Sequence, residues 1–226
     1  MSPNKGSGTA VVVGVGAERG LGAALCRRFG AEGYHVLVAG RTPEKLAQVV
    51  KTICATGGSA DAITVDTTRE DDVIRLFDGA MSPHNGRAAA DVVIFNAGNN
   101  RRIDFKELSA EQFEEFWRIG CFGGFLVGRE AARRLAPLGR GTIIFTGASA
   151  SLRGKPGFAH FAAAKADLDL SDQKGRQNRC RSRQNAGHIV RALASQASPQ
   201  YAASRSRPEF QQHSTLSNRR GQAVGA

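Results

Sequence analysis

The sequence predicts an α/β protein of the Rossmann type, in which helices cover both faces of a doubly wound parallel sheet. Over the first 168 residues, short apolar runs alternate with longer segments whose apolar residues recur at helical spacing. The short runs, such as AVVVGV and DVVIF, are apolar at nearly every position. This pattern is typical of parallel strands that are buried on both faces.

Five strands and five helices are expected in alternation. The strands are predicted at Ala10–Val15, His35–Gly40, Ala60–Val65, Asp91–Phe95 and Thr142–Thr146. The helices are predicted at Leu21–Glu32, Pro43–Ala55, Arg69–Met81, Ala110–Leu135 and Gly157–Leu168. Two of the helix starts have a chemical basis. Pro43 suits a first turn, where its missing N–H is not needed, and Ser109 with Gln112 three residues later matches a capping box.

The sequence changes character after about residue 168. Both periodicities disappear, and only Ala186–Ala194 carries a short apolar patch. Residues 170–226 hold ten Lys and Arg against two Asp and Glu, and so contribute +8 of the net charge of +11. We therefore predict a domain of residues 1–168 and a basic, low-complexity, disordered tail of residues 169–226. An abrupt change of composition such as this is typical of a shift in the reading frame. Sequencing of the coding DNA tests this hypothesis.

Composition argues against several classes of protein. The body of the chain is nearly neutral, and the basic tail has only Tyr201 and Phe210 as aromatic residues, so no nucleic-acid partner is expected. No apolar run approaches the roughly 20 residues that span a bilayer, so neither a membrane partner nor a membrane location is expected. The four widely spaced cysteines and five scattered histidines predict no metal site. A cytoplasmic protein with reduced thiols is expected.

The clearest motif lies between the first predicted strand and the first predicted helix. It has the sequence Gly16-Ala17-Glu18-Arg19-Gly20-Leu21-Gly22. Glycines at this place allow a tight turn and a close approach of the backbone to a pyrophosphate, and the helix start offers free N–H groups. The motif therefore predicts a dinucleotide site.

With this GxxxGxG spacing, the chain resembles the short-chain dehydrogenase/reductase family over residues 8–168. Further residues match the family in order: Asp66 after the third strand, Asn96-Ala97-Gly98 after the fourth, and Lys165 at the lysine of a YxxxK motif. The resemblance implies that Asp66 touches the adenine and that Lys165 binds the nicotinamide ribose. The cofactor-binding residues that it implies are Gly16, Arg19, Gly20, Leu21, Gly22, Arg41, Asp66, Asn96, Ala97, Gly98 and Lys165.

Charge at the end of the second strand indicates which cofactor is bound. A carboxylate there suits the ribose 2′-hydroxyl of NAD, whereas a guanidinium suits the 2′-phosphate of NADP. This chain has Arg41 at that place, with Arg19 as a second cation in the glycine turn. We therefore expect NADP(H) to be preferred, with NAD(H) as an alternative cofactor. The competing interpretation is that both arginines are ordinary solvated surface residues.

The catalytic residues of the family are largely replaced. The tyrosine, serine and asparagine positions hold Phe161, Ala148 and Gly120. Phenylalanine cannot exchange a proton, so the remaining catalytic candidates are Lys165 and the neighbouring Ser149. His160 is expected to be a surface residue, because it points about 100° away from Phe161 on a helix.

Two functions therefore stay open. One is an NAD(P)-dependent oxidoreductase of a small carbonyl or alcohol substrate, and the other is an NADP(H)-binding pseudoenzyme without hydride transfer. The tail lacks the valine-rich strand and Pro-Gly loop that family members place after the YxxxK helix, so the C-terminal strands of the sheet are expected to be missing. The resemblance implies that the Trp117–Leu135 helix corresponds to the family's dimer surface. A homo-oligomer that forms through this helix is therefore an open alternative.

Overall fold

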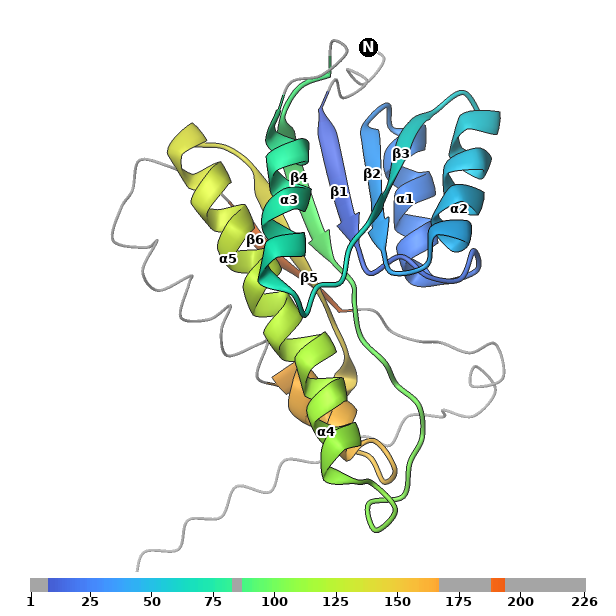
Figure 1. The fold of residues 1–226 in the computed structure, drawn as a ribbon, viewed down its shortest axis with the longest axis vertical. Coiled ribbons are helices and arrows are strands. Elements are labelled where there is room, and N and C mark those ends of the chain that lie inside the picture. The colour runs from blue at the N-terminus through green and yellow to red at the C-terminus, as the bar shows by residue number, and fades with distance from the viewer. Residues whose placement is uncertain (1–7, 83–86, 167–187, 194–226) are drawn as a thin grey trace, which may run out of the picture. The chain divides into compact units, whose positions relative to one another are not determined.

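A parallel sheet with strand order β3-β2-β1-β4-β5-β6 forms the centre of the computed structural model, which describes residues 8–82, 87–166 and 188–193 (Figure 1). The strands are β1 (Thr9–Val13), β2 (His35–Gly40), β3 (Ser59–Thr64), β4 (Ala90–Phe95), β5 (Thr142–Gly147) and β6 (His188–Leu193). Every neighbouring pair is parallel. The chain leaves β1 toward β2 and later returns to β4 on its other side, so the strand order reverses beside β1. Ligands of such sheets bind at this switch point, beyond the carboxyl ends of the strands.

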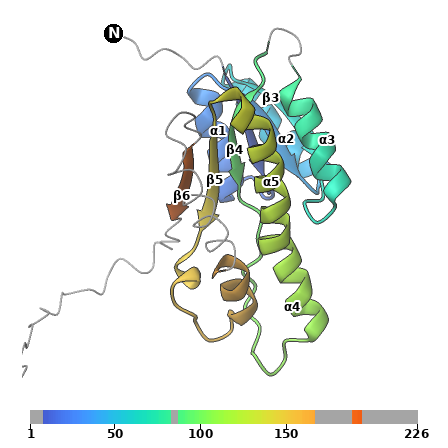
Figure 2. The ribbon, with the colours of Figure 1, turned by 90° about the vertical axis from the view of Figure 1, so that its left-hand side faces the viewer.

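Helices cover both faces of the sheet (Figures 1 and 2). They are α1 (Leu21–Ala31), α2 (Pro43–Ala55), α3 (Glu70–Met81), α4 (Ala110–Trp117) and α5 (Gly123–Leu135), with the π-helical turn η1 (Arg118–Phe122) joining α4 to α5. Two short 3-10 turns, η2 (Ala136–Leu138) and η3 (Ser149–Ser151), flank β5, and residues 159–166 are helical. Figure 2 shows α4 and residues 159–166 beyond the carboxyl ends of the strands.

Alternating side chains of the strands divide the core into two layers. Val11 and Val13 of β1 pack with α3 and α5, while Val12 packs with α1 and α2. All three are fully buried. Because both faces of the sheet are buried at its centre, β1, β2 and β4 are apolar at successive positions rather than at every second one, which explains the runs in the sequence.

The predicted Rossmann fold class is confirmed. The five predicted strands and the first four predicted helices match β1 to β5 and α1 to α5 within two residues at each end, with Ala110–Leu135 divided by η1. The Ser109 capping box is also confirmed, since the Gln112 N–H donates to Ser109 Oγ and the Ser109 N–H donates to Gln112 Oε1, both at 3.2 Å.

One strand lies where the sequence predicted none. Within the predicted tail, His188–Leu193 forms β6 and pairs with β5 from Thr142↔His188 to Gly147↔Leu193. The short apolar patch Ala186–Ala194 contains this strand, but it stands alone within a polar, basic stretch and was therefore not predicted as a strand. The rest of the tail lies outside the described residues, so the division at residue 168 stays a prediction.

The described residues also bear on thiols and membranes. Cys26, Cys54 and Cys121 are free thiols, and burial raises the pKa of Cys26 to about 12. A thiol with so high a pKa is unreactive near neutral pH, which fits a packing role. In the part of the chain that the structure describes, no helix is both long and apolar enough to cross a membrane.

The capping box leads to a stability prediction. We expect Ser109→Ala to lower the free energy of unfolding by about 1 kcal/mol, because the Gln112 N–H loses its acceptor at the start of α4. Urea denaturation followed by circular dichroism measures the change. Ser109→Asp, which keeps an acceptor oxygen, should stay near the parent protein, and equal losses in both variants would contradict the capping explanation.

Candidate active site

The turn after β1 is closely packed on one side and open on the other. The N–H groups of Gly14 and Val15 donate to the Ala39 carbonyl oxygen at 2.9 and 3.0 Å. Gly14 has a φ of +89°, and a Cβ there would lie 2.3 Å from the Ala97 nitrogen, so only glycine fits. At Gly16, in contrast, no heavy atom of the described residues lies within 4 Å of an added Cβ.

The N-terminus of α1 opens at the end of this turn. Gly20 is its N-cap residue and carries no side chain to occupy the first N–H groups, and the first turn is apolar. Free N–H groups and the positive end of the helix dipole attract an anion. Leu21 is 44% exposed, and Arg19 is an exposed residue of the turn. The open side of the glycine turn therefore suits a pyrophosphate.

The segment after β4 joins this turn. The Asn96 N–H donates to the Val13 carbonyl oxygen at 2.8 Å, and its Nδ2 donates to the Gly14 carbonyl oxygen at 3.3 Å. A Cβ on Gly22 would lie 3.1 Å from the same Nδ2. The structure thus brings Asn96 and the glycine turn together, although they are far apart in the sequence.

Lys165 lies next to the same segment. Its Nζ donates to the Thr146 carbonyl oxygen at 3.0 Å and to the Ala97 carbonyl oxygen at 3.5 Å, and the residue is only 5% exposed. A Cβ on Gly98 would lie 3.5 Å from this Nζ and 3.9 Å from the Phe161 ring. The ammonium group is therefore fixed between the ends of β4 and β5.

The residues at the three altered positions, Phe161, Gly120 and Ala148, carry no group that exchanges a proton. The centre of the Phe161 ring lies 6.0 Å from Lys165 Nζ. A Cβ on Gly120 would lie 2.9 Å from the Ala164 Cβ, so the helix of residues 159–166 fills the space that a side chain at position 120 needs. Ala148 is the extended N-cap of η3, and the next residue, Ser149, is exposed at its start.

The expectation that His160 is a surface residue is wrong. Its exposure is 0%, its ring packs 4.2 Å from the Phe116 ring, and its Nε2 lies 3.0 Å from the Arg101 carbonyl oxygen. The helix turns His160 away from Phe161 as expected, but that side faces α4 rather than solvent. Burial lowers its pKa, so His160 is a neutral packing residue that holds the loop after β4.

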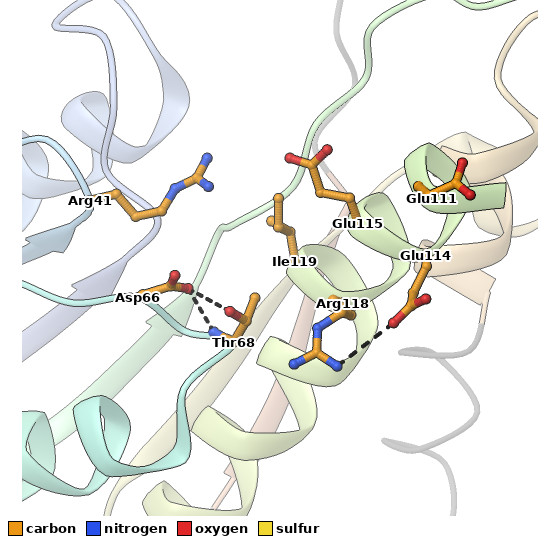
Figure 3. Close-up of a pocket in the computed structure, with 8 residues that line it drawn as sticks. All are labelled: Arg41, Asp66, Thr68, Glu111, Glu114, Glu115, Arg118 and Ile119. Carbon is orange, nitrogen blue, oxygen red and sulfur yellow. Dashed lines mark hydrogen bonds and ion pairs between the residues drawn. The ribbon is translucent and has the colours of Figure 1, made fainter. Parts of the chain in front are cut away.

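A pocket of about 350 Å³ lies between the ends of β2 and β3 and the start of α4 (Figure 3). Its lining comprises Arg41, Asp66, Thr68, Glu111, Glu114, Glu115, Arg118 and Ile119. Arg41 and Asp66 were expected to share a site, and both line the pocket. The residues of α4 and η1 were not predicted to contribute, although their i, i+4 spacing shows that Glu111 and Glu115 share one face of α4.

Asp66 is held in its ionised form. Its Oδ1 accepts hydrogen bonds from the Thr68 N–H at 2.9 Å and the Thr68 Oγ at 2.8 Å. Partial burial opposes ionisation, but these two bonds and the charges of Arg41 and Arg69 outweigh it, so the pKa of Asp66 is lowered. Asp66 is therefore an acceptor at neutral pH. Across the described ranges, no group of three His, Cys, Asp or Glu residues is placed to hold a metal ion.

Comparisons with known proteins agree with this geometry. Residues 10–172 match the family described as short chain dehydrogenase. Versicolorin reductase 1 of Dothistroma septosporum is 34% identical over 160 residues, which are 70% of this chain and 59% of the relative. Gluconate 5-dehydrogenase of Gluconobacter oxydans is 31% identical over 150 residues, 66% of this chain and 57% of the relative. The matched region thus spans less than two thirds of these relatives.

A solved structure is similar along more of its length. The crystal structure of a short-chain dehydrogenase from Rhodopseudomonas palustris superposes with a TM-score of 0.71 at 37% sequence identity. The match covers 81% of this chain and 84% of that one. The likeness therefore extends well beyond the glycine motif alone.

The Asp66 contacts predict a shift in titration. Thr68→Val removes the Oγ–H donor, so we expect the pKa of Asp66 to rise toward its ordinary value of 3.8, as measured by NMR of the carboxyl carbon. The pKa of Asp66 is lower in the folded protein than in the unfolded chain. The stabilisation that ionised Asp66 contributes is therefore fully present above pH 3.8, and it is lost as the pH falls through the pKa of the folded protein. The variant should lose less stability on acidification. Thr68→Ser keeps the donor and should titrate like the parent.

Proposed function

Because this chain belongs to the short-chain dehydrogenase family, we propose that it is an oxidoreductase that interconverts a small carbonyl compound and an alcohol with NADP(H), NAD(H) being the alternative cofactor. The observation that carries this proposal is the position of Lys165. Its ammonium lies between the ends of β4 and β5, beside Gly98, at the edge of the sheet where the glycine turn opens. Family members in general bind NAD(P)(H) and act on small molecules.

The described residues fit the proposed cofactor. Gly16 faces open space that a pyrophosphate can enter, and the N-terminus of α1 supplies donors at the same point. We assign Gly16, Arg19, Gly20, Leu21 and Gly22 to the pyrophosphate side. The pocket in Figure 3 then takes the adenosine, with Asp66 near the base and Arg41 near the 2′-phosphate. We assign the nicotinamide ribose to the remaining residues, Asn96, Ala97, Gly98 and Lys165.

The chemistry divides between the cofactor and the chain. When bound, NADPH supplies a hydride to the carbonyl carbon of the substrate. The carbonyl oxygen then needs a proton, which Phe161 cannot donate and which the buried His160 cannot reach. We assign this proton to the exposed Ser149 or to a water molecule, with Lys165 positioning the ribose beside them.

A second candidate function is an NADP(H)-binding pseudoenzyme. Its support is the packing at Gly120, where the Ala164 methyl occupies the space that an asparagine would need. Together with Phe161 and Ala148, this leaves Lys165 as the remaining member of the family's four catalytic positions. The cofactor half of the site is the same in both candidates, so binding and turnover must be measured separately.

Self-association and location complete the proposal. Trp117, Phe122 and Phe125 form a stack with ring centres 6.1 and 6.4 Å apart, and Phe125 is 46% exposed. An exposed aromatic surface of this kind suits a second copy, so we propose a homo-oligomer through Trp117–Leu135. Free thiols at Cys26, Cys54 and Cys121 suit the reducing cytoplasm, where we place the protein.

Arg41 leads to a prediction about cofactor choice. Arg41→Asp should weaken NADPH binding and spare or improve NADH binding, because it removes a partner of the 2′-phosphate and supplies an acceptor for the ribose hydroxyl. Calorimetric titration with both nucleotides measures the two affinities. An unchanged preference would overturn the role of Arg41.

Gly16 tests the site itself. Gly16→Val should abolish binding of both NADPH and NADH while leaving the fold intact, because its side chain points into open space rather than into the protein. Thermal denaturation establishes that the variant is folded, and the same calorimetric titration measures binding. Gly14→Val is the matched contrast: it should unfold the protein, because its Cβ meets the Ala97 nitrogen. Retained binding in folded Gly16→Val would place the pyrophosphate elsewhere.

Restoring the missing hydroxyls tests the two candidate functions. Phe161→Tyr returns a proton donor near Lys165, and general acid–base help is worth roughly 10²–10⁴-fold in rate. Substrate orientation can contribute more, about 7–11 kcal/mol of the barrier, and we expect the walls that supply it to be absent from residues 169–226. Phe161→Tyr with Ala148→Ser should therefore give little carbonyl reduction and nearly unchanged NADPH affinity. Brisk turnover of ketones, followed by the loss of NADPH absorbance, would mean that the tail builds a working pocket.

A further inference from the structure

We infer that Glu115 of α4 is a second residue that determines cofactor choice and that it acts against Arg41, weakening the preference for a 2′-phosphate. This inference rests on the proposed function, since it assumes that the Figure 3 pocket takes the adenosine end of the cofactor. Glu115 is not part of the family motifs, and we assign to it an effect on 2′-phosphate binding that is opposite to the effect of Arg41.

The charges that line the pocket are unbalanced. Four carboxylates and two guanidinium groups line it. Glu114 and Arg118 form an ion pair with Nη1 and Oε1 3.9 Å apart, and Asp66 is engaged by Thr68. Among the described residues, no ion pair joins Arg41 to a carboxylate. Arg41 acts electrostatically on Asp66, and Glu111 is hydrogen-bonded with Ser109. Within the described part of the chain, Glu115 is therefore the lining carboxylate that no hydrogen bond or ion pair engages.

The geometry of α4 directs the Glu115 carboxylate into the pocket (Figure 3). Glu111 and Glu115 are spaced at i and i+4, so they form one stripe on α4, and Ile119 of η1 is buried next to it. Figure 3 shows Arg41 and Glu115 on opposite sides of the pocket with their charged ends directed toward one another. Two carboxylates at i, i+4 repel rather than neutralise each other. Hydrogen bonding with Ser109 lowers the pKa of Glu111, so Glu111 is charged as well.

A 2′-phosphate and a 2′-hydroxyl respond differently to this stripe. A phosphate monoester carries about −1.5 to −2 charges near pH 7, and so it is attracted by Arg41 and repelled by Glu115. A hydroxyl carries no net charge, so Glu115 does not repel it. The stripe therefore penalises NADP(H) alone. Because Glu115 is exposed, solvent and salt screen the repulsion, and its effect is moderate.

The test uses two nucleotides that lack nicotinamide, so that the altered catalytic half plays no part. Adenosine 2′,5′-bisphosphate and adenosine 5′-monophosphate are titrated into the full chain by calorimetry at low salt. Glu115→Gln should tighten the bisphosphate about twofold to fivefold, the range of exposed charge pairs, and leave the monophosphate unchanged. Glu115→Lys should tighten it further. Both gains should shrink at 0.5 M salt, where the Debye length falls to about 4 Å.

Glu107→Gln is the matched control, because it makes the same charge change on the loop before α4, outside the pocket lining. If Glu107→Gln tightens the bisphosphate as much as Glu115→Gln does, the effect is one of net charge and the inference is wrong. If Glu115→Gln tightens both nucleotides equally, the inference is also wrong, because the 2′-phosphate that only the bisphosphate carries would then not be the group that Glu115 repels. If neither nucleotide binds the parent chain, the proposed cofactor site fails and the inference fails with it.

Discussion

The close contact between the turn after β1 and the segment after β4 is the constraint on which the site depends. Gly14 and Ala97 approach so closely that no Cβ fits at position 14, and Asn96 ties the two segments through its N–H and its Nδ2. This contact fixes the glycine turn on one side and presents the Ala97 carbonyl to Lys165 on the other. The pyrophosphate side and the ribose side of the proposed site are thus held by one junction of backbone.

The two halves of the site have different physical characters. The cofactor half is built from backbone groups that are already satisfied or open to a ligand, and its form follows from glycines. The catalytic half is filled by side chains: Phe161 lies beside Lys165, and Ala164 packs onto Gly120. A chain can therefore keep a dinucleotide site through its backbone while losing proton transfer through a few substitutions, which is why both candidate functions share one cofactor.

The sequence was sufficient where structure follows from local pattern. Apolar runs predicted five strands, the glycine spacing predicted the turn, and Ser109 with Gln112 predicted the start of α4. It was insufficient where a residue's environment is set by a distant segment. His160 was expected at the surface because a helix shows which way a side chain points but not that Phe116 lies there. The α4 carboxylates of the pocket were missed for the same reason. The strand β6 was missed because HIVRAL is a single short apolar patch within a polar, basic stretch that has no periodicity of its own.

The π-helical turn η1 joins α4 to α5 and makes the two helices present differently directed faces to their surroundings. A π-helical turn holds one more residue than an α-helical turn, and each residue of an α-helix advances about 100° around the axis. The phase of α4 is thereby offset from that of α5, so that α5 buries Leu126 and Val127 against the sheet while α4 turns Glu111 and Glu115 toward the pocket. Removal of a single residue from Arg118–Phe122 would rotate α4 by about 100° about its axis. That rotation would replace the charges that line the pocket and would also turn Phe116 away from His160.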